Sequence, residues 1–205
     1  MRSIIAFLYF FLVIPGLIHA QSADSKVSKK DSILLSKFNA KGIYPLIKSS
    51  KFCAVLPVDN ITDKADPAMK YKLLFDFAQG TIDSVKVKEM NRGLAEIGRI
   101  INLHIAAGVK PENLEIVIVA RGKAIYSLFS NDAFKKKFKA DNPNTTIIQE
   151  LESAGASFVT CGQAMQLMDI DRSSLQDNVK VAIAAKVALS TYQLKGYVTY
   201  DISEE

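Results

Sequence analysis

The chain contains few of the side chains that bind metals or build disulfide frameworks. Its 205 residues include two cysteines and two histidines. Two cysteines are too few for the disulfide framework of a chain this long, and the four residues together show no metal-ligand spacing. The glycine pattern of a phosphate-binding loop is also missing. We therefore expect no metal centre and no cofactor, and any thiol chemistry must involve Cys53 or Cys161.

Internal repeats and low-complexity tracts are absent as well, and neither sign of charge dominates. Hydrophobic residues make up 49% of the chain and charged residues 23%, which is an ordinary globular composition. The length suits one domain with a sizeable core. The formal net charge is +5, and the densest basic run spans residues 135–139. Such a run is typical of a solvated helix face, so we expect no nucleic-acid partner.

The longest apolar run lies near the N-terminus, between Ile4 and Ile14. It is shorter than the roughly 20 residues that a membrane-spanning helix needs. The run follows the single charge of Arg2, is broken by Pro15, and is followed by a segment that ends at Ala20. This layout predicts a secretory signal peptide at residues 1–20. We therefore expect an exported protein without a membrane anchor, periplasmic if the source is a Gram-negative bacterium.

The next segment predicts little regular structure. Residues 21–32 are polar and indicate a flexible leader. Residues 33–69 have an irregular pattern that is punctuated by three prolines, and this favours an extended N-terminal arm. The expected organisation is a signal peptide at 1–20, a leader and arm at 21–69, and an α/β domain at 70–205.

From residue 70 onward, apolar strand patterns alternate with helical ones. Strands are predicted at 71–77, 114–120, 156–160, 179–185 and 197–202, and helices at about 90–107, 143–154, 161–168 and 186–195. Asn142 is the expected cap of the second helix, with Pro143 at its first position. This alternation predicts an α/β fold with a single parallel five-stranded sheet and helices on both faces.

Four stretches of the chain resemble the DsrE/DsrF-like family in its exported, stand-alone branch: "YKLLFDF", "NLHIAAGVKPENLEIVIVARG", "DNPNTTIIQELESAGASFVTCGQAM" and "VALSTYQLKGYVTYD". The resemblance runs from about Tyr71 to Asp201. Its most specific part is an asparagine-proline helix start, then a strand, and then Cys161-Gly162-Gln163. The resemblance implies a compact parallel α/β fold that assembles as homo-oligomers, and we expect a trimer. It also implies sulfur relay, in which the residue matching Cys161 takes up sulfane sulfur as a persulfide and passes it on.

Cys161 ends a predicted strand and opens a predicted helix. If the strand order is flavodoxin-like, 2-1-3-4-5, Cys161 lies at the switch point between the first and third strands, where open α/β sheets place their chemistry. The free N–H groups and positive dipole end of a helix stabilise a thiolate or persulfide anion, and Gly162 leaves the sulfur approachable. The alternative is a buried cysteine that only fills space.

Neighbouring polar residues complete the candidate site. Arg121 and Lys123 follow the second strand and can hold an anionic group near Cys161, although a solvated loop explains them equally well. Asp76 ends the first strand, and we expect it to pair with a cation or a backbone N–H. Gln163 joins Gly162 as a substrate-binding candidate. Family members often carry His-Gly where this chain has Arg121-Gly122, and arginine does not shuttle protons near neutral pH.

Two functions stay open at this point. The first is sulfur relay or thiol-redox chemistry through Cys161, with sulfurtransferase-like activity and a protein sulfur donor or acceptor. The second is a non-catalytic binding or assembly module that keeps the fold. Cys53 belongs to the arm, and nothing in the sequence places it at the carboxyl edge of the sheet, so we expect no Cys53–Cys161 disulfide.

Overall fold

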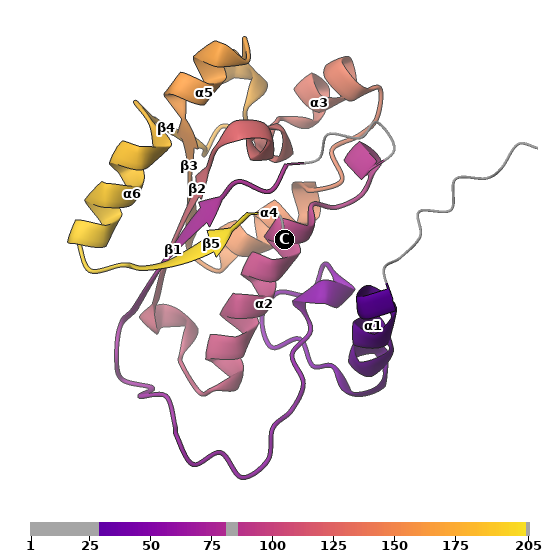
Figure 1. Cartoon of the computed structure of the whole chain (residues 1–205), viewed down its shortest axis with the longest axis vertical. Helices are drawn as coiled ribbons and strands as arrows, with labels where there is room; N and C mark the ends of the chain where they lie inside the picture. The colour runs from indigo at the N-terminus through magenta and orange to yellow at the C-terminus, as the bar shows by residue number, and fades with distance from the viewer. Residues whose placement is uncertain (1–28, 81–85, 204–205) are drawn as a thin grey trace, which may run out of the picture.

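The computed structural model describes residues 29–80 and 86–203, and its centre is a five-stranded sheet (Figure 1). Every pair of neighbouring strands is parallel, and the strand order is β4-β3-β2-β1-β5. The strands are β1 (Tyr71–Phe77), β2 (Leu114–Ala120), β3 (Ala156–Cys161), β4 (Lys180–Ala182) and β5 (Val198–Ile202). The predicted parallel α/β fold is thereby confirmed. The expected signal peptide lies outside the described residues.

Helices cover both faces of the sheet, as the alternating pattern predicted. They are α1 (Lys29–Lys41), α2 (Arg92–Ala106), α3 (Asn131–Phe138), α4 (Thr145–Ser153), α5 (Gly162–Leu167) and α6 (Ala185–Leu194). Short 3-10 segments lie between them: η1 (Lys51–Cys53), η2 (Lys86–Lys88), η3 (Pro111–Asn113), η4 (Gly122–Leu128) and η5 (Arg172–Ser174). In the part of the chain that the structure describes, no helix is long and apolar enough to cross a membrane.

The strand order differs from the expected flavodoxin-like order. The chain adds β2, β3 and β4 successively on one side of β1, and then returns to place β5 on the other side. The order therefore reverses between β1 and β5, whereas Cys161 ends β3 between β2 and β4. The expectation that Cys161 lies at the switch point is wrong.

The return from β4 to β5 explains why α6 lies apart from the other helices. Connections between parallel strands are right-handed, so a connection that runs across the sheet in the opposite direction must pass over the opposite face. On that face α6 contacts β1, β2 and β3, and Figure 1 shows it on the far side of the sheet from α2. The two faces of the sheet therefore support two separate core layers.

Strand alternation sorts the buried side chains into these layers. On β2, Ile116 and Ile118 belong to the large core under α2 and α4, whereas Val117 and Val119 belong to the small core under α6. β2 is buried along almost its whole length, as its nearly continuous apolar sequence predicted.

Two element boundaries differ from the sequence prediction. β4 has three residues instead of the predicted seven, and it forms an edge of the sheet. Asn142 does not cap α4, because the helix begins at Thr145 with Asn144 in the cap position. The Asn142 side chain instead binds the preceding loop, where its Nδ2 donates to the carbonyls of Ser127 and Phe129 at 3.0 and 2.8 Å. The Asn142 Oδ1 accepts a hydrogen bond from the backbone N–H of the cap residue Asn144 at 3.0 Å, so the side chain joins the loop to the start of α4.

The N-terminal arm is more ordered than its sequence predicted. Residues 29–41 form helix α1, which buries Phe38, where a leader and an irregular arm were expected. Beyond α1 the arm has little regular structure, with η1 and one bridge between Ile43 and Val55. It nevertheless contributes Ile47 and Cys53 to the large core.

Asn102 of α2 anchors this arm to the domain through four side-chain hydrogen bonds. Its buried Oδ1 accepts hydrogen bonds from the backbone N–H groups of Leu46 and Ile47, at 3.0 and 2.9 Å. Its Nδ2 donates to the carbonyls of Ile47 and Cys53, both at 2.8 Å. One turn earlier, a Cβ on Gly98 would lie 2.8 Å from the Cys53 sulfur. The close approach of the arm therefore requires glycine at that position.

We predict that Asn102→Ala destabilises the fold by about 3 to 5 kcal/mol, because it leaves three buried backbone groups and one partly buried backbone group without a partner and opens a cavity. Urea unfolding measures the change. Asn113→Ala is the matched control, since the Asn113 side chain makes one hydrogen bond, to the Pro67 carbonyl, at the surface; the change should cost less than about 1 kcal/mol. Equal small losses in both variants would show that Asn102 does not anchor the arm.

Candidate functional site

Cys161 ends β3 and is the N-terminal cap of α5. Its side chain is 8% exposed, and its Sγ accepts a hydrogen bond from the Ala164 N–H at 3.5 Å. Gly162 follows at a tight contact with β4, where a Cβ would lie 2.8 Å from the Ala182 carbonyl oxygen. The glycine thus permits the close packing of β4 beside the thiol. The strand-to-helix junction predicted around Cys161 is present in the structure.

Asp76 and Arg121 form an ion pair at the carboxyl edge of the sheet. Arg121 Nε donates to Asp76 Oδ1 at 2.7 Å, and Nη2 donates to Oδ2 at 3.3 Å. The Arg121 side chain is 41% exposed and that of Asp76 is 17% exposed. The hydrogen bonds to Asp76 raise the pKa of the Arg121 guanidinium, with smaller contributions from Asp201 and Cys161. The expectation that Asp76 pairs with a cation therefore holds in the structure.

Strand register places this ion pair next to Cys161. Ala120 pairs with Thr160, so the next residues, Arg121 and Cys161, lie side by side on neighbouring strands. Alternation puts both on the α6 face, because Val119 and Cys161 both belong to the core under α6. Arg121 thus lies between the Asp76 carboxylate on one strand and the Cys161 sulfur on the other.

Asp201 is a further member of this edge that the sequence reasoning missed. It pairs in register with Asp76 on the neighbouring strand β5, and it lies close enough to raise the pKa of Arg121. The signal was present, because β1 and β5 each carry an aspartate at the position before the last. Only the correct strand order would have shown that these strands are neighbours.

Two other predicted site residues lie outside the cluster that Asp76, Arg121, Cys161 and Asp201 form. Lys123 and Gln163 are exposed, and their side chains make no hydrogen bond or ion pair with any described residue. The Gln163 backbone N–H donates to the Ile183 carbonyl at 3.1 Å, which ties the start of α5 to the end of β4. Gln163 thus helps to fix the local fold through its backbone.

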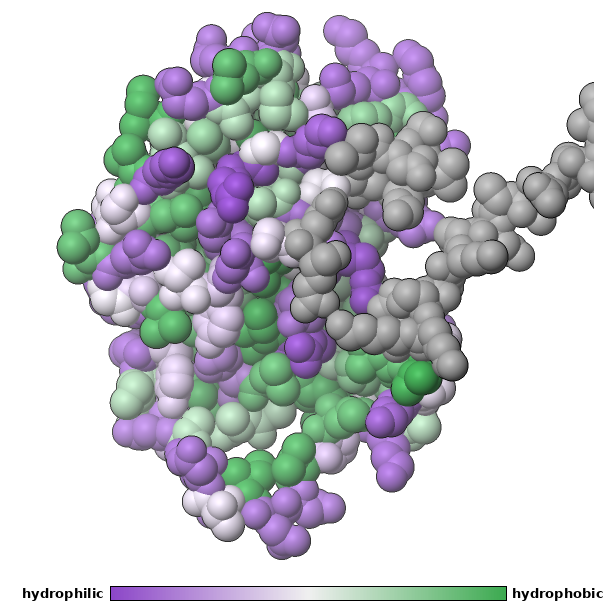
Figure 2. Space-filling model, viewed as in Figure 1, coloured by the Kyte–Doolittle hydropathy of each residue, from purple (hydrophilic) through white to green (hydrophobic). Residues whose placement is uncertain are grey.

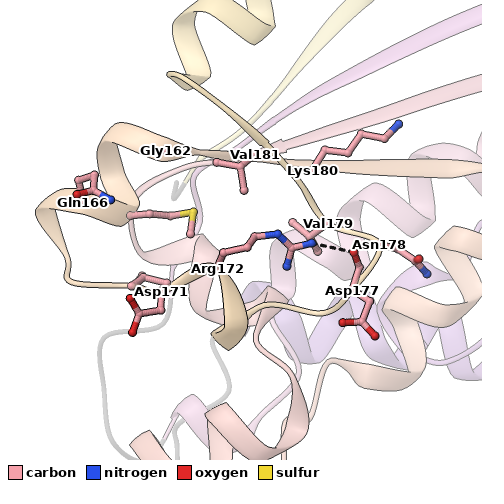
Figure 3. Close-up of a pocket in the computed structure, with 11 residues that line it drawn as sticks. Gly162, Gln166, Asp171, Arg172, Asp177, Asn178, Val179, Lys180 and Val181 are labelled. Atoms are coloured by element: carbon pink, nitrogen blue, oxygen red, sulfur yellow. Dashed lines mark hydrogen bonds between the residues drawn. The ribbon is translucent and has the colours of Figure 1, made fainter.

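A pocket of about 800 Å³ lies between α5, η5 and β4 (Figure 3). Gly162 contributes to its wall, but Cys161 does not. The pocket-lining Val181 pairs with Thr160, so it points to the face of the sheet opposite Cys161. Within this pocket Arg172 Nη2 donates to the Asp177 carbonyl at 2.8 Å. The cavity is therefore not a substrate chamber for the thiol, even though it begins one residue away.

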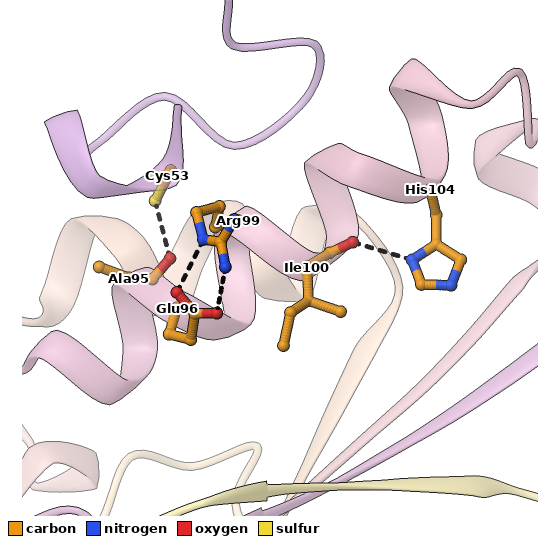
Figure 4. A network of polar contacts seen from close by, with 6 residues as sticks. All are labelled: Cys53, Ala95, Glu96, Arg99, Ile100 and His104. Atoms are coloured by element: carbon orange, nitrogen blue, oxygen red, sulfur yellow. Dashed lines mark hydrogen bonds and ion pairs between the residues drawn. The ribbon is translucent and has the colours of Figure 1, made fainter. Parts of the chain in front are cut away.

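Cys53 is a different kind of thiol. It lies fully buried against α2, where its Sγ donates to the Ala95 carbonyl at 3.4 Å (Figure 4). Burial raises its pKa from 9.0 to about 12. Cys53 belongs to the core under α2 and Cys161 to the core under α6, so the sheet separates the two free thiols. Among the described residues no group of His, Cys, Asp and Glu side chains could hold a metal ion.

The geometry defines a parallel α/β protein that presents a helix-capping thiol beside an arginine. The model of the DsrE/DsrF-like family matches residues 74–200, and the chain belongs to this family. The resemblance seen in the sequence is thereby confirmed. No curated protein matched the chain.

Two solved structures are similar to this chain at low sequence identity. Protein MTH1491 of unknown function from Methanobacterium thermoautotrophicum is 19% identical with a TM-score of 0.45, and the match covers 64% of this chain and 98% of that one. The ychN protein from E. coli is 14% identical with a TM-score of 0.43, and the match covers 65% and 99%.

We predict that iodoacetamide labels Cys161 and leaves Cys53 unreacted in the folded protein at pH 7. Burial raises the pKa of Cys53 to about 12, which keeps it as the unreactive neutral thiol at that pH, and burial blocks access as well. The Cys161→Ser and Cys53→Ala variants isolate each thiol for rate measurements. Both should react alike in denaturant. Equal slow rates for both thiols in the folded protein would contradict an activated Cys161.

Proposed function

We propose that this protein carries sulfane sulfur as a persulfide on Cys161. The observation that carries the proposal is the position of the Cys161 sulfur, which accepts the Ala164 N–H at the start of α5 and lies beside Arg121. Backbone N–H groups at a helix start and a guanidinium both stabilise an anionic sulfur. Membership of the DsrE/DsrF-like family, which is associated with sulfur relay, supports the same chemistry.

The proposed reaction is an exchange of one sulfur–sulfur bond for another. The Cys161 thiolate attacks the sulfane sulfur of a persulfide or thiosulfate donor, a new S–S bond forms on Cys161, and the donor leaves as a thiolate or as sulfite. An acceptor thiolate then removes the outer sulfur in the same way and regenerates the Cys161 thiolate. No net oxidation or reduction accompanies either step, so no redox cofactor is required.

Arg121 fits this exchange better than it fits acid–base catalysis. Its guanidinium stays charged at any working pH and cannot relay a proton. Thiolate–persulfide exchange, as written above, moves charge and sulfur but needs no proton transfer at this position. The replacement of the family's frequent histidine by Arg121 is therefore consistent with a site that stabilises anions.

A second function is an assembly module, and an exposed apolar surface favours it. Ile183 and Val187 are exposed just after the edge strand β4 and at the start of α6, and Figure 2 shows hydrophobic surface on the side of the molecule that carries α6. Edge strands with apolar side chains tend to pair with another chain. We propose that a second copy of this chain covers this surface in a homo-oligomer.

Sulfur loading is tested by trapping the persulfide. After incubation with thiosulfate or cysteine persulfide and alkylation, we expect the wild type to gain the mass of one sulfur atom on the peptide that contains Cys161. The Cys53→Ala variant should load equally, and the Cys161→Ser variant should not load. A wild type that never gains this mass, under conditions where Cys161 alkylates readily, would refute the carrier function and favour the assembly module.

Assembly is tested by light scattering at micromolar concentration. We expect the mass of a trimer for the wild type and a smaller mass for Ile183→Lys, because a lysine at the proposed interface must lose its hydration. Leu103→Lys is the matched control, since Leu103 is also exposed but lies on α2 away from β4. A wild type of monomer mass, or equal effects of both variants, would count against this surface.

A further inference from the structure

We propose that Asp76 is a positioning residue that governs Cys161 by competing with its sulfur anion for the Arg121 guanidinium. This inference rests on the proposed function, in which Cys161 becomes a persulfide. In the structure the guanidinium is bound by Asp76, which lies on β1, rather than by the sulfur on β3. A persulfide on Cys161 introduces a second anion for the same cation.

The register of the sheet makes the competition feasible. Arg121 follows β2, the strand between those of Asp76 and Cys161, and the three side chains share the α6 face. Asp76 engages Nε and Nη2 of Arg121, while Nη1 makes no hydrogen bond with any described residue. A long arginine side chain on the middle strand can thus reach a partner on either side, and needs only side-chain rotations to change partner.

The local charges set the direction of the equilibrium. Asp76 is the less exposed member of the ion pair. A carboxylate that is partly withdrawn from water is destabilised when its cation leaves. A neutral Cys161 thiol offers no charge in return, so Arg121 stays with Asp76. A persulfide is a stronger acid than a thiol and is anionic near neutral pH, so it attracts the guanidinium. Asp201, next to Asp76 on β5, is a further carboxylate close to the same cation.

The competition predicts a dependence that simple charge repulsion does not. If Asp76 acts by holding Arg121, replacing Asp76 frees the guanidinium for Cys161 and accelerates thiolate reactions. The acceleration then requires Arg121. If Asp76 only repels the thiolate through space, the same replacement accelerates the reaction whether or not Arg121 is present.

A double-mutant cycle on the iodoacetamide rate of Cys161 at pH 7 separates the two cases, with Cys53→Ala as the common background. We expect Asp76→Asn to raise the rate about three- to tenfold, because the released Arg121 guanidinium stabilises the Cys161 thiolate. In the presence of Arg121→Met, the same change should alter the rate by less than about twofold. Asp76→Glu, which keeps the carboxylate, should stay near the wild-type rate.

Glu96→Gln is the matched control, because it breaks a carboxylate–arginine pair of the same kind, between Glu96 and Arg99 on α2, on the face of the sheet opposite Cys161. It should change the Cys161 rate by less than about twofold. Thermal unfolding of every variant verifies that the fold persists, and Arg121→Gln replaces Arg121→Met if the latter does not fold. An equal acceleration by Asp76→Asn with and without Arg121, or no acceleration in either case, would overturn the competition.

The alkylation cycle needs no sulfur donor, so its result is independent of persulfide trapping. If the cycle behaves as predicted but Cys161 never loads sulfur, the carrier function falls while the control of the thiol by Asp76 is supported. If Cys161 loads sulfur but the cycle shows no dependence on Arg121, the carrier function survives and Asp76 has no positioning role.

Discussion

The right-handedness of connections between parallel strands is the constraint on which the arrangement of the site depends. Three connections carry the chain outward from β1 to β4, and a fourth must return it to β5. Because the return runs in the opposite direction, its helix must cross the opposite face. That single helix gives the α6 face its own small core, with Cys161 beneath it. The same return brings β5, and with it Asp201, alongside β1, so that a second carboxylate joins the edge where Arg121 already meets Asp76.

Much of this arrangement could be predicted from local sequence, and the remainder depended on strand order. β1 and β2 matched their predicted ends because each is a continuous apolar run between loop residues. Cys161 was correctly placed at a strand-to-helix junction for the same reason, since glycine and helix-forming residues follow it directly. The strand order could not be read in this way, because the apolar pattern of β5 contains no information on which strand it joins. Cys161 was therefore expected at a switch point that lies elsewhere in the sheet, and Asp201 was missed.

The arm was misjudged because its stability comes from a residue far away in the sequence. Residues 42–55 form little regular structure of their own, and Pro45 favours an irregular chain. Their backbone groups are satisfied by Asn102, a fully buried polar residue of α2 next to the apolar Ile101. An asparagine within an apolar stretch was the available signal, because a buried amide must find several partners. The sequence did not indicate that those partners were backbone groups 49 to 56 positions earlier.

The hydrogen bonds that hold the arm against the domain also affect when Cys53 becomes protected during folding. Leu46 and Asn102 are 56 positions apart, and Lys48 and Glu150, whose carboxylate accepts the Lys48 N–H, are 102 apart. Closing such long chain segments costs more conformational entropy than forming a local helix does, so we expect these contacts to form after the local helices. Until they form, the Cys53 thiol is open to oxidants and to other thiols. The chemical protection of Cys53 is thus acquired after the local helices form, and a chain that folds slowly is exposed to wrong disulfides for correspondingly longer.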